Sequence, residues 1–298
     1  MTENALKTYK HESKPSAKSI VAKTAIYLGL ILFALWILIP FYIVVITSFK
    51  TRIEAQSPEF TMWPKDGFHW DGYIEVLGYK AGYSSIPVVW LGLLNTLLIV
   101  LPPTVIGLFT SSLAAYAFAK LRFKSKNFLF SVLLATMMIP GTIMLTPSYL
   151  LYDKIYWTGT AFPLMIPGMF GAAACVFFMR QFYMGIPTDL IEAAKLDGMG
   201  YFGIFFRIMV PLSVPALLAQ GILGFIGGYN DYFGPYLYLT DPTMYTLQIA
   251  LNSFQGTYAS KWPTMMAGAV CALIPTLLIY ILAQKYFIQG IATAGMKL

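Results

Sequence analysis

One segment of the sequence gathers side chains that could bind a hydroxyl-rich ligand. Within an apolar stretch it places Tyr229, Asn230, Asp231, Tyr232 and Tyr236. Aromatic faces stack on the C–H surfaces of sugars, while amide, carboxylate and phenol groups hydrogen-bond to sugar hydroxyls. Tyrosines also collect at membrane interfaces, and the preceding Gly227-Gly228 could simply bend or pack a helix. A ligand pathway, with Asn95 as a further member, is therefore one hypothesis for this segment, and helix packing is the other.

A second segment, residues 187–211, has the pattern of two short helices joined by a glycine. Pro187 suits a first helical position, because its missing N–H would have no intrahelical partner there. Gly198 can adopt the left-handed backbone conformation that ends a helix. The first helix should therefore run from Pro187 to Asp197, about 16 Å, which is too short to cross a bilayer. The second should run from Met199 to Met209.

The composition is that of an integral membrane protein. Of the 298 residues, 58% are hydrophobic and 11% are charged, and the mean hydropathy is +0.67, unlike a soluble domain. A bilayer core of about 30 Å needs about 20 apolar residues in a helix. We therefore expect an all-α fold with six spans, in which Asp231 is the only charged residue: Ala25–Ser48, Trp90–Phe118, Phe128–Tyr149, Phe162–Met179, Leu212–Tyr238 and Thr264–Gln284.

The Lys and Arg residues predict which side of the membrane each loop occupies. Most lie before the first span, between the second and third spans, or near the helix pair at 187–211. Because basic residues close to membrane ends stay in the cytoplasm, both termini and the helix pair are expected there. The net charge of +7 fits this topology and contact with anionic membrane lipid, and does not indicate a nucleic-acid surface.

Residues 192–211 also carry a motif. Glu192-Ala193-Ala194 is followed by three residues and Gly198, then by nine residues and Ile208-Met209-Val210-Pro211. This resembles the cytoplasmic EAA loop of bacterial ABC-importer permeases, and the one departure is Val210, where the family has Leu. The alternative for the same helix pair is an interfacial helix that rests on lipid headgroups.

The resemblance covers about residues 90–298 and is greatest to carbohydrate-uptake permeases of the type that includes the shorter maltose permease subunit. Phe225 to Pro235 is similar to the family's fifth-helix pattern, and Gln284 to Gly290 resembles its C-terminus. The last residues, Gly-Met-Lys-Leu, depart from the usual Gly-Ala-Val-Lys-Gly. The resemblance implies a type I ABC importer permease fold: a cytoplasmic tail (1–24), a first span with its outer loop (25–89), a permease core (90–286) containing the EAA loop (183–214), and a cytoplasmic tail (287–298).

The same resemblance implies a function and partners. The chain would form half of a carbohydrate pathway, for an oligosaccharide, in the bacterial cytoplasmic (inner) membrane. It would lie beside a second permease subunit, with two copies of an ATP-binding subunit and an extracytoplasmic solute-binding protein. Glu192, Ala193 and Ala194 would form the face that docks on the ATP-binding subunit, with Asp197 and Gly198 setting the turn. The last outer loop would reach the binding protein through Asn252, Gln255, Gly256, Thr257 and Tyr258.

Neither a catalytic site nor a metal site is expected on this chain. The sequence has no GxxxxGK[ST] phosphate loop, so ATP and its Mg would bind to the partner subunits. Cys175 and Cys271 fall inside predicted spans and are expected to fill space. The alternative function is a self-contained secondary carrier of a small polar solute. Such carriers generally keep a titrating group at mid-membrane depth, whereas His11 and His69 lie outside the predicted spans.

Overall fold

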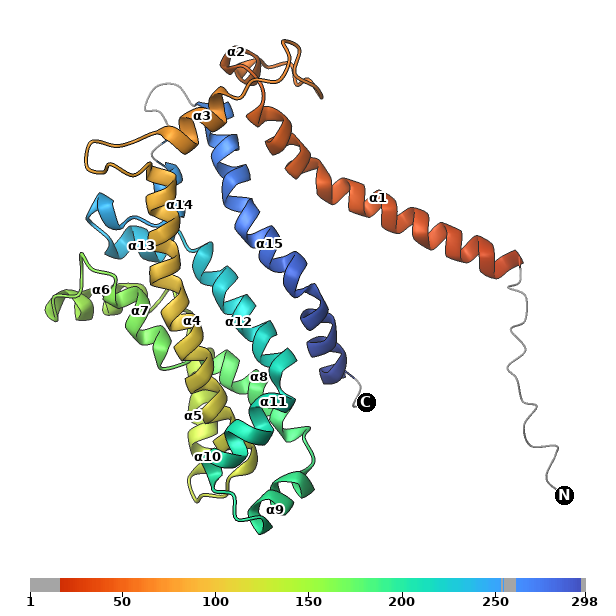
Figure 1. Ribbon diagram of the computed structural model, residues 1–298, viewed down its shortest axis with the longest axis vertical. Coiled ribbons are helices and arrows are strands. Elements are labelled where there is room, and N and C mark those ends of the chain that lie inside the picture. Colours follow the sequence, from red (N-terminus) through yellow and green to blue (C-terminus); the bar gives the residue numbers. More distant parts are fainter. Residues whose placement is uncertain (1–16, 253, 255–260, 296–298) are drawn as a thin grey trace.

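The computed structural model describes residues 17–252, 254 and 261–295, which form helices and no strand. In chain order the elements are α1 (Ala17–Ser48), α2 (Arg52–Gln56), α3 (Asp71–Gly78), α4 (Val88–Lys120), α5 (Lys126–Met137), α6 (Leu145–Lys154), α7 (Phe162–Met169), α8 (Ala173–Met184), α9 (Thr188–Leu196), α10 (Tyr201–Ile204), the π-helix η1 (Phe205–Met209), α11 (Val210–Leu212), α12 (Val214–Tyr229), α13 (Phe233–Tyr238), the 3₁₀ helix η2 (Pro242–Met244), α14 (Leu247–Asn252) and α15 (Trp262–Gly295). Figure 1 shows α2 and α3 at one end of the bundle, the cap end, and α9 and α10 at the other, the EAA end.

Helix α4 runs through the middle of the bundle and contacts α3, α7, α8, α12 and α14. Two buried apolar clusters lie along it, one near the EAA end around Tyr116, Met179 and Phe205, the other near the cap end around Val100 and Tyr229. Close packing of α4 on α7 depends on Gly107, because a Cβ at that position would lie 2.3 Å from the carbonyl oxygen of Gly168. Burial of these apolar side chains is what holds the short helices against α4.

Among the described residues, four stretches are long and apolar enough to cross a membrane: Ile20–Ser48, Val88–Lys120, Phe162–Met184 and Trp262–Gln284. A fifth results if the bent pair Tyr201–Leu212 and Val214–Tyr229 counts as one span. These stretches overlap five of the six predicted spans, and the third of them contains α7 and α8 in sequence. The described residues therefore have the long apolar helices of a multi-pass membrane protein.

The remaining predicted span, Phe128–Tyr149, is not one helix, so that prediction was wrong. Helix α5 ends at Met137, turns occupy residues 138–144, and α6 begins at Leu145. The cause is Pro140, which lacks a backbone N–H and disfavours helical conformation at the residue before it. At 12 residues, α5 is about 18 Å long by the helical rise and does not cross a bilayer core unaided.

The fifth predicted span, Leu212–Tyr238, is also interrupted. Helix α12 ends at Tyr229 and α13 begins at Phe233. Polar side chains in the gap compete for the backbone: the Asn230 amide donates to the Ile226 carbonyl (3.0 Å), and Asp231 Oδ1 accepts from the Gly234 N–H (3.1 Å). The predicted ligand segment therefore lies at a break between two helices.

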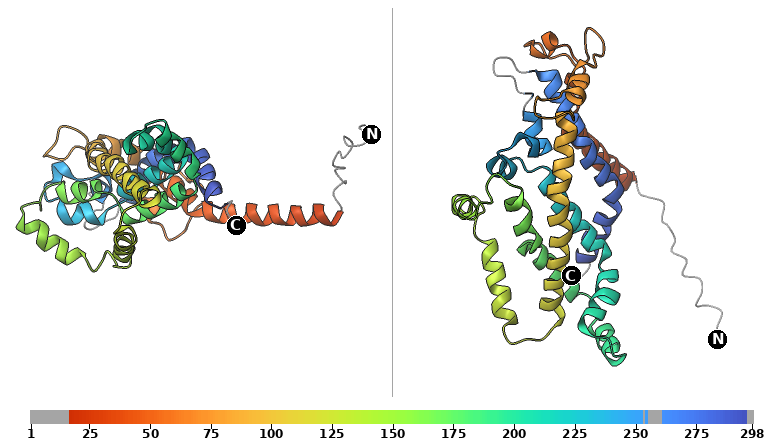
Figure 2. Two further views of the ribbon diagram at one scale, coloured as in Figure 1. Left: turned by 90° about the horizontal axis from the view of Figure 1, so that it is seen from below. Right: turned by 60° about the vertical axis from the view of Figure 1, so that its left-hand side comes forward.

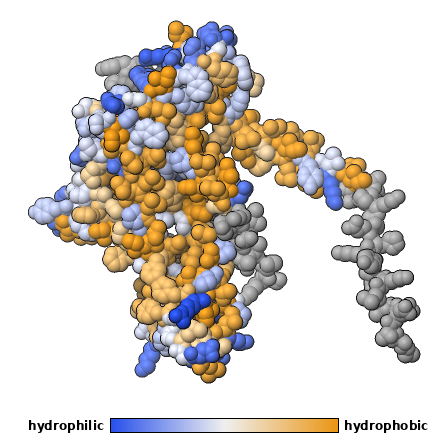
Figure 3. Space-filling view, in the orientation of Figure 1, coloured by the Kyte–Doolittle hydropathy of each residue, from blue (hydrophilic) through white to orange (hydrophobic). Residues whose placement is uncertain are grey.

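Helix α1 packs against α15 toward the cap end and diverges from the rest of the bundle along its length (Figures 1 and 2). Every residue from Ile20 to Ile43 is exposed in the isolated chain. Figure 3 shows that apolar residues cover α1 and the middle of the molecule, while hydrophilic residues gather at its cap end. This distribution matches a protein whose middle faces lipid or other membrane helices.

Candidate functional site

The EAA end consists of two short helices on either side of Gly198, as the sequence predicted. Helix α9 covers Thr188–Leu196, and Gly198 has a φ of +80°, the left-handed conformation. Nothing lies within 4 Å of a Cβ built on Gly198, so the glycine is required for its backbone conformation and not for space. The second helix differs from the prediction, because α10 passes into the π-helix η1 and then into α11.

The motif residues do not all face outward. Glu192, Ala193, Asp197 and Gly198 are exposed, so they are accessible to another protein. Ala194 is 3% exposed and lies in the buried cluster with Ile191. The expectation that Ala194 belongs to an outward docking face was wrong, because residues three apart on a helix share a face and Ile191 turns this one toward the core.

The exposed surface of the EAA end is apolar at positions that sequence reasoning missed. Leu196 is 89% exposed, Phe202 68% and Tyr201 61%. The Lys195 ammonium lies 5.9 Å from the centre of the Tyr201 ring. A signal for Leu196 was present, since it stands between Lys195 and Asp197 on a helix that does not cross the membrane. Exposed apolar groups rimmed by charges are typical of a protein-binding surface.

The two ends of the EAA loop are hydrogen-bonded to each other, and one of them is also hydrogen-bonded to α4. The Tyr183 hydroxyl lies 2.5 Å from Ser112 Oγ of α4 and accepts from Ser213 Oγ at 3.4 Å. Tyr183 is in the last turn of α8, where the EAA loop begins, and Ser213 lies near the end of the loop, where the chain bends by 80° into α12. All three residues are at most 2% exposed. We call this group of three hydrogen-bonded residues the Tyr183 junction.

Two basic residues add further ties near this end. The Lys120 ammonium donates to the Ile186 carbonyl (2.6 Å), which joins the end of α4 to the start of the EAA loop. Arg180 Nε donates to the Phe118 carbonyl (3.2 Å), and its guanidinium lies 4.0 Å from the centre of the Phe130 ring. The loop is thus fixed to the bundle by polar contacts as well as by its apolar core.

Two of the predicted pathway residues are structural. Tyr229 is fully buried, and its hydroxyl donates to the Ala272 carbonyl of α15 (3.0 Å). Asn95 donates through its amide to the carbonyls of Thr243 (2.8 Å) and Tyr245 (3.0 Å), and so holds the last outer loop against α4. The placement of Tyr229 on an open pathway was therefore wrong, because its buried phenol is taken up by a backbone partner. Asn95 is half-buried, and its amide nitrogen is used to hold the loop.

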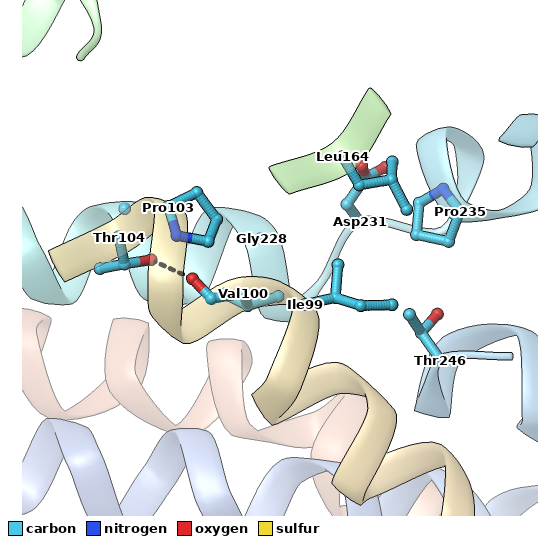
Figure 4. Close-up of a pocket in the computed structure, with 10 residues that line it drawn as sticks. Ile99, Val100, Pro103, Thr104, Leu164, Gly228, Asp231, Pro235 and Thr246 are labelled. Atoms are coloured by element: carbon cyan, nitrogen blue, oxygen red, sulfur yellow. Dashed lines mark hydrogen bonds between the residues drawn. The ribbon is translucent and has the colours of Figure 1, made fainter. Parts of the chain in front are cut away.

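The other pathway residues are exposed at the break between α12 and α13. The rings of Tyr232 and Tyr236 stack with centroids 5.5 Å apart, and the Asn252 amide donates to the Tyr232 hydroxyl (3.2 Å). Asp231 lines a cavity of about 240 Å³ together with residues of α4, α7, α12 and α13 (Figure 4). Asn230 lines a different cavity, against α1 and α15. The structure thus brings Tyr232 and Tyr236 together and places Asp231 and Asn230 in two different cavities, neither of which the two tyrosines line.

The last outer loop is anchored at both ends. Its start is held by Asn95, and its end by Glu75 of α3, which binds the Lys261 ammonium and accepts from the Thr264 hydroxyl (2.8 Å). Burial alone would raise the pKa of Glu75, but the hydrogen bonds from Lys261 and Thr264 and the charge of Lys261 together hold that pKa below its ordinary value. Of the predicted tip, Asn252 is described and exposed, whereas Gln255, Gly256, Thr257 and Tyr258 lie outside the described residues.

Comparisons with known proteins agree with this architecture. Residues 107–293, more than half of the chain, match the family described as "Binding-protein-dependent transport system inner membrane component". The chain is 31% identical over 259 residues to the arabinooligosaccharides transport system permease protein AraQ of Halalkalibacterium halodurans (87% of this chain, 90% of the relative). It is 30% identical over 269 residues to the sn-glycerol-3-phosphate transport system permease protein UgpE of Pectobacterium atrosepticum (88% and 93%).

A solved structure has the same fold. It is a chain of a bacterial ABC transporter involved in the import of the acidic polysaccharide alginate, superposed with a TM-score of 0.77 over 92% of this chain and 99% of that one, at 23% sequence identity. The EAA motif, the match over residues 107–293 and the shared fold lead to one conclusion: the chain is a membrane permease of the binding-protein-dependent transport system inner membrane component family.

Proposed function

We propose that the chain is one of two permease subunits of an ATP-driven carbohydrate importer. The observation that carries this proposal is the EAA end, where a family motif sits on two exposed short helices whose flanks meet at Tyr183, which is hydrogen-bonded both to Ser112 of α4 and to Ser213. In this arrangement, α9 and α10 dock on an ATP-binding subunit through Glu192 and Ala193 of the motif and the apolar Leu196. Asp197 and Gly198 fix the angle of the turn.

The cargo is proposed from relatives and from the ligand segment. Permeases similar to this chain include two from arabinooligosaccharide transport systems, which favours an oligosaccharide. Stacked tyrosines beside a carboxylate suit sugars, because the rings pack on C–H surfaces and the carboxylate accepts from hydroxyls. Asp231, Tyr232 and Tyr236 would then line the pathway on this chain.

The mechanism is alternating access driven from outside the chain. ATP and Mg bind to two copies of the partner subunit, and closure of that dimer moves α9 and α10. The Tyr183 junction passes this movement to α4, α8 and α12, which open the pathway to the opposite side. The ligand is delivered by an extracytoplasmic binding protein that docks on the cap end, where the last outer loop is held at both ends.

The proposal includes an orientation and a second permease. The EAA end and both termini face the cytoplasm, and the cap end faces outward across the inner membrane of a bacterium, as the distribution of Lys and Arg favours. The exposed apolar residues of α1 face lipid or the sibling permease, which supplies the other half of the pathway.

The test is purification of the tagged chain from its native membrane in mild detergent, followed by mass spectrometry. We expect a second permease and an ATP-binding subunit to be recovered with it. ATP-dependent sugar uptake should then be measured in proteoliposomes containing the recovered complex and its binding protein. Recovery of the chain alone, under conditions that keep a known importer intact, together with solute uptake by that chain alone, would replace the importer with a self-contained carrier.

A further inference from the structure

An exposed apolar loop folds back along α1 at the cap end. Residues 57–70, which we call the cap loop, connect α2 to α3. The His69 N–H donates to the Phe49 carbonyl (2.9 Å), which fixes the second half of the loop just beyond the end of α1. Before that point, the Tyr42 hydroxyl donates to the Met62 carbonyl. Tyr42 stands about 9 Å before the end of α1 by the helical rise, so the cap loop runs back beside the helix instead of projecting away from it.

The polar groups around Met62 are paired within the protein. The Lys50 ammonium donates to the Thr61 carbonyl (2.6 Å), and the Thr61 hydroxyl donates to the Glu54 carboxylate (2.6 Å). Together with the bond from Tyr42, two successive carbonyls of the loop thus receive side-chain donors. Surface loops commonly leave such carbonyls to water. Pairing within the protein suits a loop in contact with lipid, where an unpaired backbone group is costly.

Lys50 is the first basic residue after the apolar stretch of α1, and the cap loop covers it. Its side chain is 3% exposed, and its ammonium lies 4.0 Å from a Glu54 carboxylate oxygen and 4.8 Å from the centre of the Phe60 ring. A lysine at the end of a membrane helix ordinarily extends into water. Here its charge is paired and shielded instead, as a charge close to the hydrocarbon requires.

The side chains that the cap loop turns outward are apolar or aromatic. Phe60 is 55% exposed, Met62 69% and Trp63 61%. Because Met62 is bonded to Tyr42, these side chains adjoin the exposed apolar surface of α1. Exposed apolar patches of this kind mark sites of contact with a protein or a membrane, and aromatic residues gather at the boundary between lipid and water.

A pair of charged residues limits how deep the cap loop can lie. Glu59 and Lys65, on either side of residues 60–64, form an ion pair at 3.5 Å, and their side chains are 80% and 62% exposed. Exposed charges are costly in the hydrocarbon core, whereas in the headgroup layer they reach water. The loop therefore combines an apolar surface with charges that require water, which are the two surroundings that a membrane interface provides.

We propose that the cap loop anchors the cap end of α1 in the membrane interface, with Phe60, Met62 and Trp63 lying in the headgroup layer of the nearer lipid leaflet. Lipid is favoured over a protein partner because the loop adjoins a helix long and apolar enough to span the membrane, and because exposed charges flank its apolar surface. The anchor depends on neither the cargo nor the sidedness of the importer, since it needs only a membrane around α1.

Spin labelling at two positions tests this anchor. A nitroxide-bearing amino acid would replace Met62 or, as the control, Ile53, so that no cysteine of a partner subunit is labelled. Both side chains are apolar and exposed, at 69% and 86%, so the label should disturb the packing at neither position. Ile53 belongs to α2, which Figure 1 shows farther toward the cap end than α1. Position 53 should therefore lie in water and position 62 in the interface.

The measurement is power-saturation EPR on the full chain, with any subunits that co-purify, in liposomes of phosphatidylethanolamine and phosphatidylglycerol without binding protein. Collisions of the label with oxygen, which concentrates in lipid, would be compared with collisions with a nickel chelate that stays in water. The ratio of oxygen to nickel collisions should be severalfold higher at position 62 than at position 53.

Two results would overturn the anchor. Equal ratios at the two positions would place the cap loop in water, where a binding protein could reach it. Few collisions with either reagent at position 62 would show that a protein surface, such as that of the sibling permease, covers the loop. Either result leaves the proposed importer unaffected, because co-purification of the ATP-binding subunit does not depend on the cap loop.

Discussion

The variant Tyr183→Phe removes one hydroxyl at the Tyr183 junction. It allows the contribution of that hydroxyl to protein stability to be measured separately from its contribution to the coupling of ATP hydrolysis and transport. In Tyr183→Phe the ring remains and continues to fill its buried site, but Ser112 Oγ loses its hydrogen bond of 2.5 Å. Ser112 is 2% exposed, and an unsatisfied buried group costs about 1–3 kcal/mol. Ser213 loses little, because its one hydroxyl proton, no longer given to Tyr183, can be donated to the Met209 carbonyl at 2.8 Å. The free energy of unfolding should therefore fall by about 1–3 kcal/mol.

The matched variant is Ser112→Ala, which removes the other partner. The double variant leaves neither hydroxyl of this bond, so its destabilisation should be smaller than the sum of the two single effects by about 0.5–3 kcal/mol. Unfolding would be followed by tryptophan fluorescence in mixed micelles with increasing SDS. Additive effects, or a Tyr183→Phe protein as stable as the parent, would refute the hydrogen-bonded junction.

The same variant tests whether the junction transmits motion. In the reconstituted complex, Tyr183→Phe should lower the amount of sugar transported per ATP hydrolysed, because the hydroxyl that joins the two flanks of the EAA loop to each other and to α4 is gone. A control at a distance is Tyr229→Phe, which removes one buried hydrogen bond near the cap end and should leave this ratio unchanged. Equal ratios for Tyr183→Phe and the parent would show that the junction is structural only.

Three further predictions concern the loops. Gly198→Pro, which cannot adopt a φ of +80°, should abolish uptake and substrate-stimulated ATPase while immunoblots still find the chain in the membrane; normal transport would argue against the coupling turn. Asn95→Ala removes two hydrogen bonds of the last outer loop and should reduce ATPase stimulation by the binding protein severalfold. Unchanged stimulation would show that these two bonds do not position the loop. Glu75→Gln should lower the free energy of unfolding at neutral pH by less than about 1 kcal/mol, since the pair is partly exposed. Because folding lowers the pKa of Glu75 below 4.5, the difference in stability between Glu75→Gln and the parent should be fully present above pH 4.5 and should be lost as the pH falls through the folded pKa. A difference in stability that persists in acid would refute the ion pair.

The sequence was sufficient where local chemistry decides the structure. The ends of α9 followed from Pro187 and Gly198, whose backbone preferences act within one turn. The long apolar helices followed from length and composition alone. The turn that opens the last outer loop is held by a local contact of the same kind, because Asp241 accepts from the Thr243 N–H at 2.8 Å.

The predictions that were wrong, and the contacts that were missed, depend on how segments far apart in the sequence pack together. Pro140 broke the third span, although proline kinks without ending many membrane helices. The direction in which Ala194 points depends on how α9 sits against the core, which a nine-residue helix does not reveal. The Tyr183 junction unites Ser112, Tyr183 and Ser213, which are 71 and 30 residues apart in pairs. Single serines and tyrosines carry no spacing signal, so only the fold could bring them together.

The central claim is that the EAA end docks on an ATP-binding subunit, and photo-crosslinking in the native membrane tests it most directly. The photoreactive amino acid p-benzoylphenylalanine would replace Leu196, which is 89% exposed at the EAA end, or Ile74, which is 69% exposed at the cap end. Irradiation should join the chain to an ATP-binding subunit, identified by mass spectrometry, from position 196 and not from position 74. Crosslinks from position 196 to lipid alone, or equal crosslinking to that subunit from both positions, would contradict the account.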